Sequence, residues 1–323
     1  MEQNQDQLVK ALQAAQMYYY QDLPMKKIAV ELGVSHSTVS RLLAWARSNG
    51  LVEIRIHDLR SRSSPLEELI KLHFRLREVR VVPVSELAGE EMWQERVARA
   101  AAAYLNQLME PNMILGVAWG NTVNQIAAHL TPKALLDAHV VQLNGGGSIP
   151  TLGNYSSGDI ITQFANNFDA QSHLLPAPAF FEFAETRQAM WRERSVRRIL
   201  EMQEQADIFL FSVGSFADNS SSAVYRSDYL SEKDYAEMRQ QGIVGDIANV
   251  MLRADGNFSD LPINERACGP DLALFHQVDR AVCVLSGPQK LSGLRAALAG
   301  GYLTDLIIDE PTARKLVQLF SAA

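Results

Sequence analysis

The chain has 323 residues, of which 47% are hydrophobic and 21% are charged, a composition typical of a globular protein of about two domains. The net charge of −7 argues against indiscriminate binding to nucleic acid, and no apolar run approaches the roughly 20 residues that would span a bilayer. No signal peptide is expected at the N-terminus, and neither Cys268 nor Cys283 has a neighbour at a zinc-ligand spacing. We therefore expect a cytoplasmic protein without a membrane segment, disulfide framework, metal or cofactor.

The N-terminal part shows three helical segments in succession. Apolar residues recur with a helical period over residues 6–20, and Asp22–Asn49 then shows two short helices that meet at Gly33. Glycine accepts the positive φ of such a tight turn at little cost. Residues 51–56 resemble a short strand, or wing. This order predicts a three-helix, winged helix-turn-helix domain over residues 1–57.

Small polar side chains open the second helix of this unit. Ser35 is placed to cap it, and Asp22 to cap the preceding helix with Pro24 in the first turn. A helix that begins with hydroxyls and an imidazole, followed by basic residues, can enter the major groove of DNA. The alternative is an ordinary helical hairpin whose polar residues only cap or face solvent. The candidates for DNA contact are Lys26, Lys27, Ser35, His36, Ser37, Thr38, Ser40 and Arg41.

The charge distribution agrees with contact to DNA at one end only. Residues 1–64 carry eight Lys and Arg against six Asp and Glu, a net of +2, which leaves −9 for the remainder. A mildly basic N-terminal domain on an otherwise acidic chain suits such a protein, although the asymmetry alone is modest.

A polar linker and a helix follow this domain. Residues 58–64 (DLRSRSS) are polar and short of apolar side chains, and Pro65 opens a helix that we expect to reach about Arg77. Its apolar stripe packs either on its own domain or on a second copy of the chain, because helix-turn-helix proteins commonly read two half-sites as symmetric dimers. We assign residues 58–78 to the linker and its helix. The stripe consists of Leu66, Leu69, Ile70, Leu72, His73 and Leu76.

From residue 79 to residue 323 the pattern alternates between β-rich runs and helical segments. Several runs are continuously apolar, which favours parallel strands covered on both faces. This predicts a mostly parallel α/β body whose ligands bind at the carboxyl ends of the strands. The expected strands are Val79–Val84, Met113–Ala118, His139–Leu143, Ala206–Val213, Arg280–Leu285 and Leu306–Ile308. The expected helices are Glu90–Met109, Asn121–Leu130, Gly158–Phe168, Ser195–Glu204, Ser231–Gln240, Pro288–Ala299 and Pro311–Phe320.

Three strand ends carry glycine-rich turns. After Gly120 a helix begins, and its backbone N–H groups, with Asn121 and Thr122, form a candidate anion site. Residues 143–148 (LNGGGS) would let a ligand approach the backbone. Lys290, expected in the first turn of a helix after SGPQ, would suit a phosphate between the helix dipole and the ammonium. Each turn could also be ordinary, with Lys290 solvated. No nucleotide fingerprint is present, so together they favour a small phosphorylated molecule.

A fourth segment, residues 242–247 (GIVGDI), supplies a carboxylate next to a flexible glycine. Asp246 could accept hydrogen bonds from sugar hydroxyls. Arg226 could pair with Asp246 or with a phosphate, and the polar residues 217–222 just before it could close over a ligand.

The ordered set of motifs resembles the SorC/DeoR-type sugar-responsive bacterial transcription regulators over nearly the whole chain. The matching motifs are the helix-turn-helix, WGNT, LNGGGS, GIVGDI and SGPQK. The resemblance implies an effector domain related in fold to sugar-phosphate isomerases and CoA transferases. It also implies dimers or tetramers that bind double-stranded operator DNA under the control of a sugar or sugar phosphate.

The resemblance also implies which residues bind the effector. Asn121, Thr122 and Lys290 would cradle a phosphate. Some family members carry a lysine before the glycines that forms a Schiff base with an aldehyde sugar, but Asn144 stands there in this chain and excludes that adduct. The whole implied set is Gly120, Asn121, Thr122, Asn144, Gly145, Gly146, Arg226, Asp246 and Lys290.

The expected function is therefore a repressor of a carbohydrate-catabolism operon, and the alternative is a sugar-phosphate isomerase or deaminase. Such an enzyme needs a general base and an acid near the sugar. We find no carboxylate-rich loop at a strand end, and His139 and His173 have no obvious acidic partner. An enzyme would also have little use for residues 1–57. A protein-interaction adaptor would leave the glycine loops unexplained.

Overall fold

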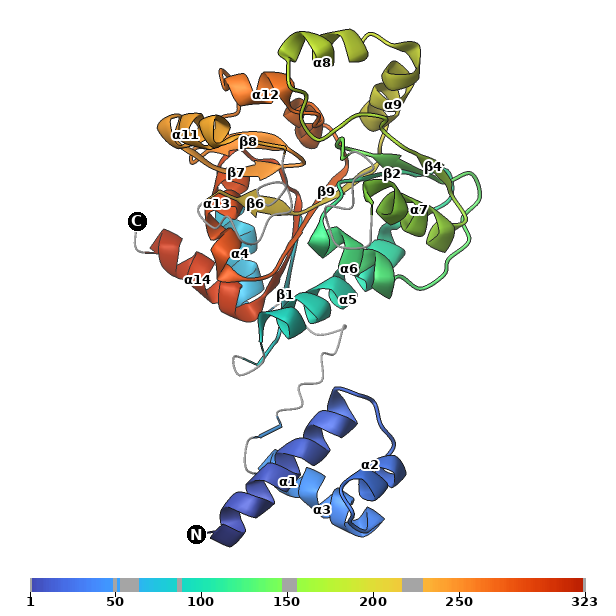
Figure 1. The fold of residues 1–323 in the computed structure, drawn as a ribbon, viewed down its shortest axis with the longest axis vertical. Coiled ribbons are helices and arrows are strands. Elements are labelled where there is room, and N and C mark those ends of the chain that lie inside the picture. The colour runs from blue at the N-terminus through green and yellow to red at the C-terminus, as the bar shows by residue number, and fades with distance from the viewer. Residues whose placement is uncertain are drawn as a thin grey trace. The chain divides into compact units, whose positions relative to one another are not determined.

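The computed structural model describes residues 2–48, 51–52, 64–85, 89–146, 156–216 and 229–321. The chain forms two compact units, Met1–Arg62 and Ser63–Ala323, which we call the head and the body (Figure 1). Within the described residues, no helix is both long and apolar enough to cross a membrane.

The head consists of three helices around one small core. They are α1 (Glu2–Tyr19), α2 (Met25–Glu31) and α3 (His36–Ser48), and Gly33 turns the chain between the last two with φ +62°. Alanines on α1 let the helices approach closely, and the i, i+3, i+4 spacing on α3 turns one face inward. The buried core residues are Ala11, Ala14, Ala15, Ile28, Ala29, Val39, Leu42, Leu43 and Ala46.

The helix starts in the head agree only in part with the prediction. Ser35 caps α3, because its Oγ accepts a hydrogen bond from the backbone N–H of Thr38 at 3.1 Å. Pro24 precedes α2 in an extended conformation, with ψ 141°, rather than lying in its first turn. The predicted cap by Asp22 is therefore wrong: Asp22 has φ +49° in the turn after α1. The expected wing lies largely outside the described residues, and at 51 the chain bends.

The body is built on a seven-stranded sheet of order β1-β10-β9-β5-β2-β3-β4. Every neighbouring pair in it is parallel, as the continuous apolar runs predicted. The three-residue strand β4 was not predicted. The strands are β1 (Glu78–Val82), β2 (Ile114–Val117), β3 (His139–Gln142), β4 (Gln171–His173), β5 (Ile208–Phe211), β9 (Arg280–Leu285) and β10 (Asp305–Asp309).

Helices cover both faces of this sheet (Figure 1). On β5, Ile208 and Leu210 pack in one core with residues of α5 (Glu90–Leu108), α6 (Asn121–His129) and α7 (Ser157–Phe168). Phe209 and Phe211 point to the other core. That core holds residues of α4 (Pro65–Phe74), α13 (Leu291–Ala299) and α14 (Glu310–Ser321).

A second sheet of antiparallel strands was missed by the sequence patterns. It has the order β6-β7-β8, with β6 (Val213–Ser215), β7 (Ile243–Ile247) and β8 (Val250–Arg253). The expected strand 206–213 breaks at Ser212, where the chain passes from one sheet to the other. The expected flexible glycine beside Asp246 is also wrong. A Cβ on Gly245 would lie 2.3 Å from the carbonyl oxygen of Gly214, so this glycine permits close strand packing.

The remaining helices differ little from the expected ones. α4 ends at Phe74 rather than near Arg77, because Arg75 takes the left-handed conformation with φ +56°. The helix expected from Pro288 begins as a 3₁₀ turn, Pro288–Lys290, and continues as α13. The others predicted are α9 (Arg194–Glu204) and α11 (Glu232–Gln240). Not predicted were α8 (Ala184–Met190), α12 (Pro262–Arg266) and the 3₁₀ turn Leu272–His276.

Candidate functional site

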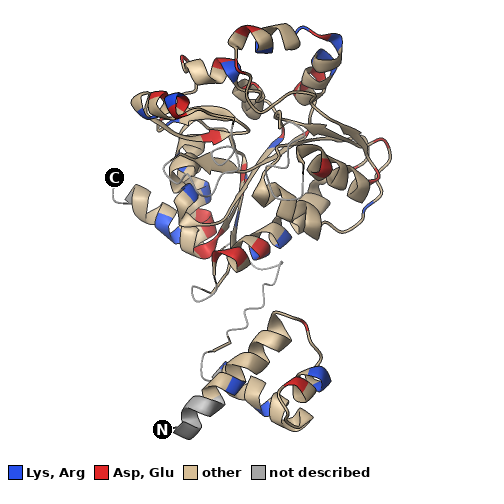
Figure 2. Cartoon of the chain, viewed as in Figure 1, with Lys and Arg blue, Asp and Glu red and all other residues tan. Residues whose placement is uncertain are grey.

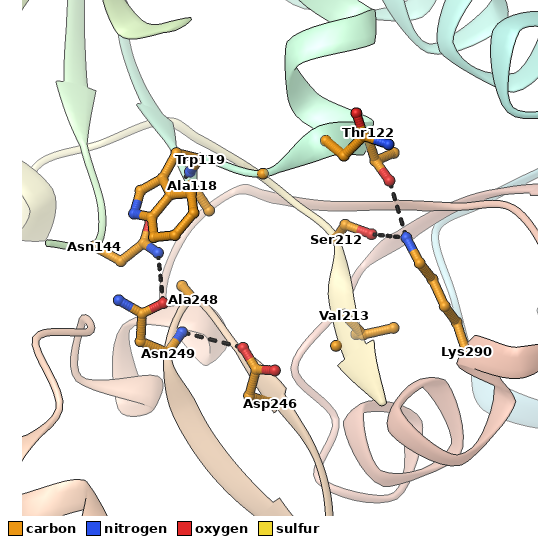
Figure 3. A pocket seen from close by; sticks show the side chains of 13 residues that line it. Ala118, Trp119, Thr122, Asn144, Ser212, Val213, Asp246, Ala248, Asn249 and Lys290 are labelled. Atoms are coloured by element: carbon orange, nitrogen blue, oxygen red, sulfur yellow. Dashed lines mark hydrogen bonds between the residues drawn. The ribbon is translucent and has the colours of Figure 1, made fainter. Parts of the chain in front are cut away.

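A pocket lies at the carboxyl ends of the parallel strands, beside the second sheet (Figure 3). The end of β2 and the start of α6 form one wall. The chain between β5 and β6, the β7–β8 turn and the residue before α13 complete it. The lining residues are Ala118, Trp119, Gly120, Asn121, Thr122, Asn144, Ser212, Val213, Gly214, Asp246, Ala248, Asn249 and Lys290.

Lys290 is buried in this pocket, with only 8% of the residue exposed. Its Nζ donates to the Oγ1 of Thr122 at 3.0 Å and to the Oγ of Ser212 at 3.4 Å. Burial lowers the pKa of Lys290 to about 8, although Cys283 and Asp246 oppose this shift. The solvated alternative for Lys290 is therefore wrong. An anion entering the pocket would favour the protonated amine, because an opposite charge nearby stabilises the ammonium.

The start of α6 lies on the same side of the pocket as Lys290. Gly120 precedes the helix with φ +153°, a conformation that favours glycine, and it offers no side chain to cap the first turn. Asn121 and Thr122 begin the helix there. Uncapped N–H groups at a helix start attract an anion. The pocket thus combines backbone donors, the Thr122 hydroxyl and an amine.

We expected Lys290 in the first turn of a helix, but it lies just before the first turn of α13. It ends the 3₁₀ turn just before α13. The N–H of Gly287, at the start of that turn, donates to the buried Oδ2 of Asp309 at 2.9 Å. The Oδ1 of Asp309 accepts from the N–H of Thr312 at 2.8 Å. Asp309 therefore joins the loop that carries Lys290 to the first turn of α14.

Asn144 and Asn249 form a hydrogen-bonded network on the opposite side. The Asn144 Oδ1 accepts from the N–H of Trp119 at 3.1 Å, and its Nδ2 donates to the Oδ1 of Asn249 at 3.0 Å (Figure 3). The Nδ2 of Asn249 donates to the carbonyl of Gly145 at 2.9 Å. The N–H of Asn249 donates to the Oδ2 of Asp246 at 3.2 Å. Much of the hydrogen-bonding capacity of the Asn144 side chain is thus satisfied within the protein.

The two glycines after Asn144 do not line the pocket. A Cβ on Gly145 would lie 2.1 Å from the carbonyl oxygen of Pro178, and one on Gly146 would lie 2.6 Å from the Oγ of Ser157. Their lack of side chains permits this close packing of the protein. Arg226, also expected at the site, lies outside the described residues.

The turn Ala248–Asn249 is the part of the pocket that the sequence patterns missed. These two residues join β7 to β8 with φ +47° and +74°. Two-residue hairpins favour positive φ at both positions, where Asn and Gly are the usual residues. Asn249 was the one residue in the sequence that indicated such a turn. Ala248 did not indicate it, because alanine is not typical of a position with positive φ. Trp119 and Ser212 were also missed, although Trp119 lies within the WGNT motif.

The residues expected to contact DNA gather on α2 and at the start of α3. Seven of the eight are exposed, and Thr38 is half-buried. The Oγ of Ser35 lies 2.8 Å from both the Oγ of Ser37 and the Oγ1 of Thr38, so these hydroxyls form one cluster. Figure 2 shows Lys and Arg on the same two helices. The head thus presents hydroxyls, an imidazole and cations together.

The histidines considered for an enzyme lie away from the pocket lining. The Nδ1 of His139 is 3.0 Å from the Nε2 of His173, and its Nε2 is 3.7 Å from the Oδ1 of Asp137. The expectation that they lack an acidic neighbour is therefore wrong. His139 begins β3, at the end of the strand opposite to the pocket. The described part of the chain contains no group of three or more His, Cys, Asp or Glu that could hold a metal ion.

Known proteins resemble this chain over most of its length. Residues 60–318 match the family described as "Putative sugar-binding domain". The deoxyribonucleoside regulator of Bacillus subtilis is 35% identical over 98% of this chain and 99% of its own. The sorbitol operon regulator of Klebsiella pneumoniae is 27% identical over 98% of this chain and 100% of its own.

Solved structures agree with these sequence matches. The crystal structure of a domain of a possible sugar-binding transcriptional regulator from Arthrobacter aurescens has a TM-score of 0.73 at 41% identity, covering 81% of this chain and 100% of that chain. The full-length sorbitol operon regulator from Klebsiella pneumoniae has a TM-score of 0.72 at 25% identity, covering 97% of this chain and 99% of its own.

Proposed function

The chain belongs to the SorC/DeoR family of sugar-binding transcriptional regulators, and on that premise we propose that it represses a carbohydrate-catabolism operon until a sugar or sugar phosphate binds the body. Its relatives are named transcriptional regulators, and it is a regulator rather than an enzyme. The observation that carries the proposed effector class is the buried amine of Lys290, which faces the Thr122 hydroxyl at the uncapped start of α6.

The head is the proposed DNA-reading unit. Helix α3 begins with exposed hydroxyls and an imidazole and continues to Arg41, which suits entry into the major groove. We accordingly assign residues 1–57 to a winged helix-turn-helix domain, 58–78 to the linker and its helix, and 79–323 to the effector domain. Paired half-sites on DNA would be read by a homodimer or a tetramer. The proposed place of action is the cytoplasm.

The body pocket is the proposed effector site. A phosphate would contact Lys290, Thr122, Asn121 and the N–H groups after Gly120, and the sugar would extend toward Asp246 and the Asn144–Asn249 network. Binding is non-covalent at position 144, because an amide cannot form a Schiff base. Arg226 remains a candidate that the family resemblance suggests, whereas Gly145 and Gly146 pack against the protein and do not line the pocket.

The proposed signal passes from the pocket to α14. An anion at Lys290 would draw in the loop that precedes it, and that loop is bonded through Asp309 to the first turn of α14. Such an effector changes operator affinity only to the extent that it binds the DNA-free and DNA-bound arrangements unequally.

The direct experiment is a titration of the full chain against the DNA upstream of its operon at fixed salt, followed by fluorescence anisotropy. The named functions of the relatives suggest two probes, a deoxypentose phosphate and a hexitol phosphate, each compared with its unphosphorylated form. A repressor is expected to release the DNA when the effector is added. If no sugar or sugar phosphate changes operator affinity, the proposed switch is refuted, and tighter binding would refute the repressor role.

A further inference from the structure

Two glutamines are buried in the body at positions where apolar residues are usual. Gln142 ends the strand β3, and Gln203 lies in the last turn of α9, on the same face as the buried Val196. Each glutamine is only 2% exposed. A buried side-chain amide is unfavourable unless its donors and acceptors find partners. We therefore asked which groups these two amides bond.

Both amides bond the backbone of the segment that leaves β3. The Nε2 of Gln203 donates to the carbonyls of Gln142 and Leu143 at 2.8 and 3.2 Å. The Nε2 of Gln142 donates to the carbonyl of Asn144 at 2.7 Å, and its Oε1 accepts from the N–H of Leu175 at 3.2 Å. Side chains thus bond the carbonyls of residues 142–144 in succession.

The edge strand β4 is too short to hold this segment. Its last pair with β3 is His173 with Val141, so the ladder ends just before Gln142. Carbonyls left unpaired at a buried strand end would cost free energy. The two glutamine amides take the place of the missing strand. The direction in which the chain leaves β3 therefore depends on them.

Asn144 is the pocket residue that these bonds hold in place. Its side chain bonds the N–H of Trp119 and the side chain of Asn249, and the N–H of Asn249 bonds Asp246 (Figure 3). A continuous chain of hydrogen bonds thus runs from α9 to Asp246, the carboxylate proposed to meet the sugar. Neither glutamine lines the pocket. They would act on a ligand only through the residues that they hold.

The Lys290 end of the pocket has a separate support. The loop before Lys290 is bonded through the N–H of Gly287 to Asp309, and Asp309 is bonded to the N–H of Thr312. Neither bond includes a residue of β3 or α9. Removal of a glutamine amide should therefore disturb the sugar end of the pocket and largely spare the phosphate end. A general loss of stability would affect both ends.

We propose that Gln203 and Gln142 are positioning residues of the effector site, which fix Asn144 and, through it, the groups that meet the sugar. Held in place before the ligand arrives, these groups need not be ordered when it binds. The proposal rests on the proposed function in that the pocket binds the effector. Its first test is made without a ligand, so that the two can fail separately.

The first test is hydrogen exchange of the ligand-free full chain, resolved to single amides by mass spectrometry. Gln203→Met nearly keeps the side-chain volume but removes the N–H donors. Exchange should become about tenfold faster at the N–H groups of Trp119 and Asn249, and stay unchanged at those of Gly287 and Thr312. Unchanged exchange at the first pair, or an equal increase at both pairs, overturns the proposal.

The second test titrates the full chain by calorimetry with the deoxypentose phosphate, the hexitol phosphate and inorganic phosphate. Gln203→Met should raise the Kd of the sugar phosphate that binds the parent by about tenfold, and that of inorganic phosphate by less than about threefold. Equal weakening of both overturns the proposal. A parent that binds neither sugar phosphate contradicts the proposed function, and the exchange rates then decide the positioning.

The matched control is Tyr302→Phe. It removes a buried hydrogen bond of 2.8 Å from the Tyr302 hydroxyl to the carbonyl of Gly256, and neither residue lines the pocket. This variant should leave both affinities unchanged, together with the exchange at Trp119 and Asn249. If it reproduces the effects of Gln203→Met, those effects come from lost stability and the proposal is overturned.

A double-mutant cycle tests the route through Asn144. In an Asn144→Ala background, Gln203→Met should weaken sugar phosphate binding by no more than about twofold further, because the residue through which it acts is gone. A fully additive loss overturns that route. Gln203→Ala serves if Gln203→Met does not fold, because it leaves room for a water that donates to one of the carbonyls. Exchange at Trp119 and Asn249 should then rise by about threefold, and unchanged exchange overturns the proposal.

Discussion

Replacing Lys290 by methionine is expected to stabilise the ligand-free protein while it abolishes the response to a phosphorylated effector. Burial lowers the pKa of Lys290 from 10.5 to about 8. At 1.36 kcal/mol for each pKa unit, this difference corresponds to about 3 kcal/mol of unfavourable free energy in the folded state. Methionine removes that charge with little change in side-chain volume. Losing the hydrogen bonds to Thr122 and Ser212 destabilises the folded variant by about 1–2 kcal/mol. The free energy of unfolding should therefore rise by about 1–2 kcal/mol at pH 7.

The stability difference between the parent and the Lys290→Met variant should depend on pH. Because the folded pKa lies below the unfolded one, the unfolded chain binds the additional proton between about pH 8 and 10.5. The stability of the parent relative to the variant should therefore rise with pH through that window. The advantage of the methionine variant is fully present below pH 8 and should have disappeared above pH 10.5.

Urea unfolding of parent and variant at pH 7 and pH 9.5, with and without a sugar phosphate, measures both effects. The control is Lys133→Met. Lys133 Nζ donates to the carbonyls of Asn106 and Met109 at 2.8 and 2.6 Å, so its removal should destabilise the protein and leave effector binding intact. The reasoning is refuted if Lys290→Met lowers stability by more than about 1 kcal/mol, or if it still responds to the effector.

Four further predictions address the head, the turn, the loop and the covalent chemistry. Arg41→Ala should weaken operator binding by about 1–3 kcal/mol if it reads a base, with effector binding unchanged in a thermal-shift assay; equal operator affinity would remove it from the interface. Ala248→Gly should raise the free energy of unfolding by about 0.5–1 kcal/mol in urea, because glycine adopts φ +47° without strain; a loss of stability would contradict this. Asp309→Ala should retain effector binding by calorimetry but blunt operator release, whereas a full release would refute the role of Asp309 in the signal. Borohydride treatment with an aldehyde sugar phosphate should leave no adduct in the peptide that contains Asn144, which mass spectrometry would reveal.

The sequence predicted well those features that depend on near neighbours. The helical period, Gly33 and the Ser35 cap located the helices of the head, and the continuous apolar runs indicated the parallel strands of the body. Its errors arose where a distant contact overrides local preference. Gly245 looked flexible in the sequence, but it lies in a strand against the backbone of Gly214. The second sheet was missed because its strands are short and two of them contain a glycine.

The sequence by itself determined the parallel sheet, because continuous apolar runs indicate strands that are covered on both faces. The edge at which to look for a ligand site then follows from the general rule for such sheets. Only the tertiary structure decided which groups meet there. Lys290 reaches Thr122 across 168 residues, and Asn144 reaches Asn249 across 105. Such pairs depend on the order of strands in the sheets and on their register, which no local pattern encodes. Burial of the amine, and with it the lowered pKa, follows only from that assembly.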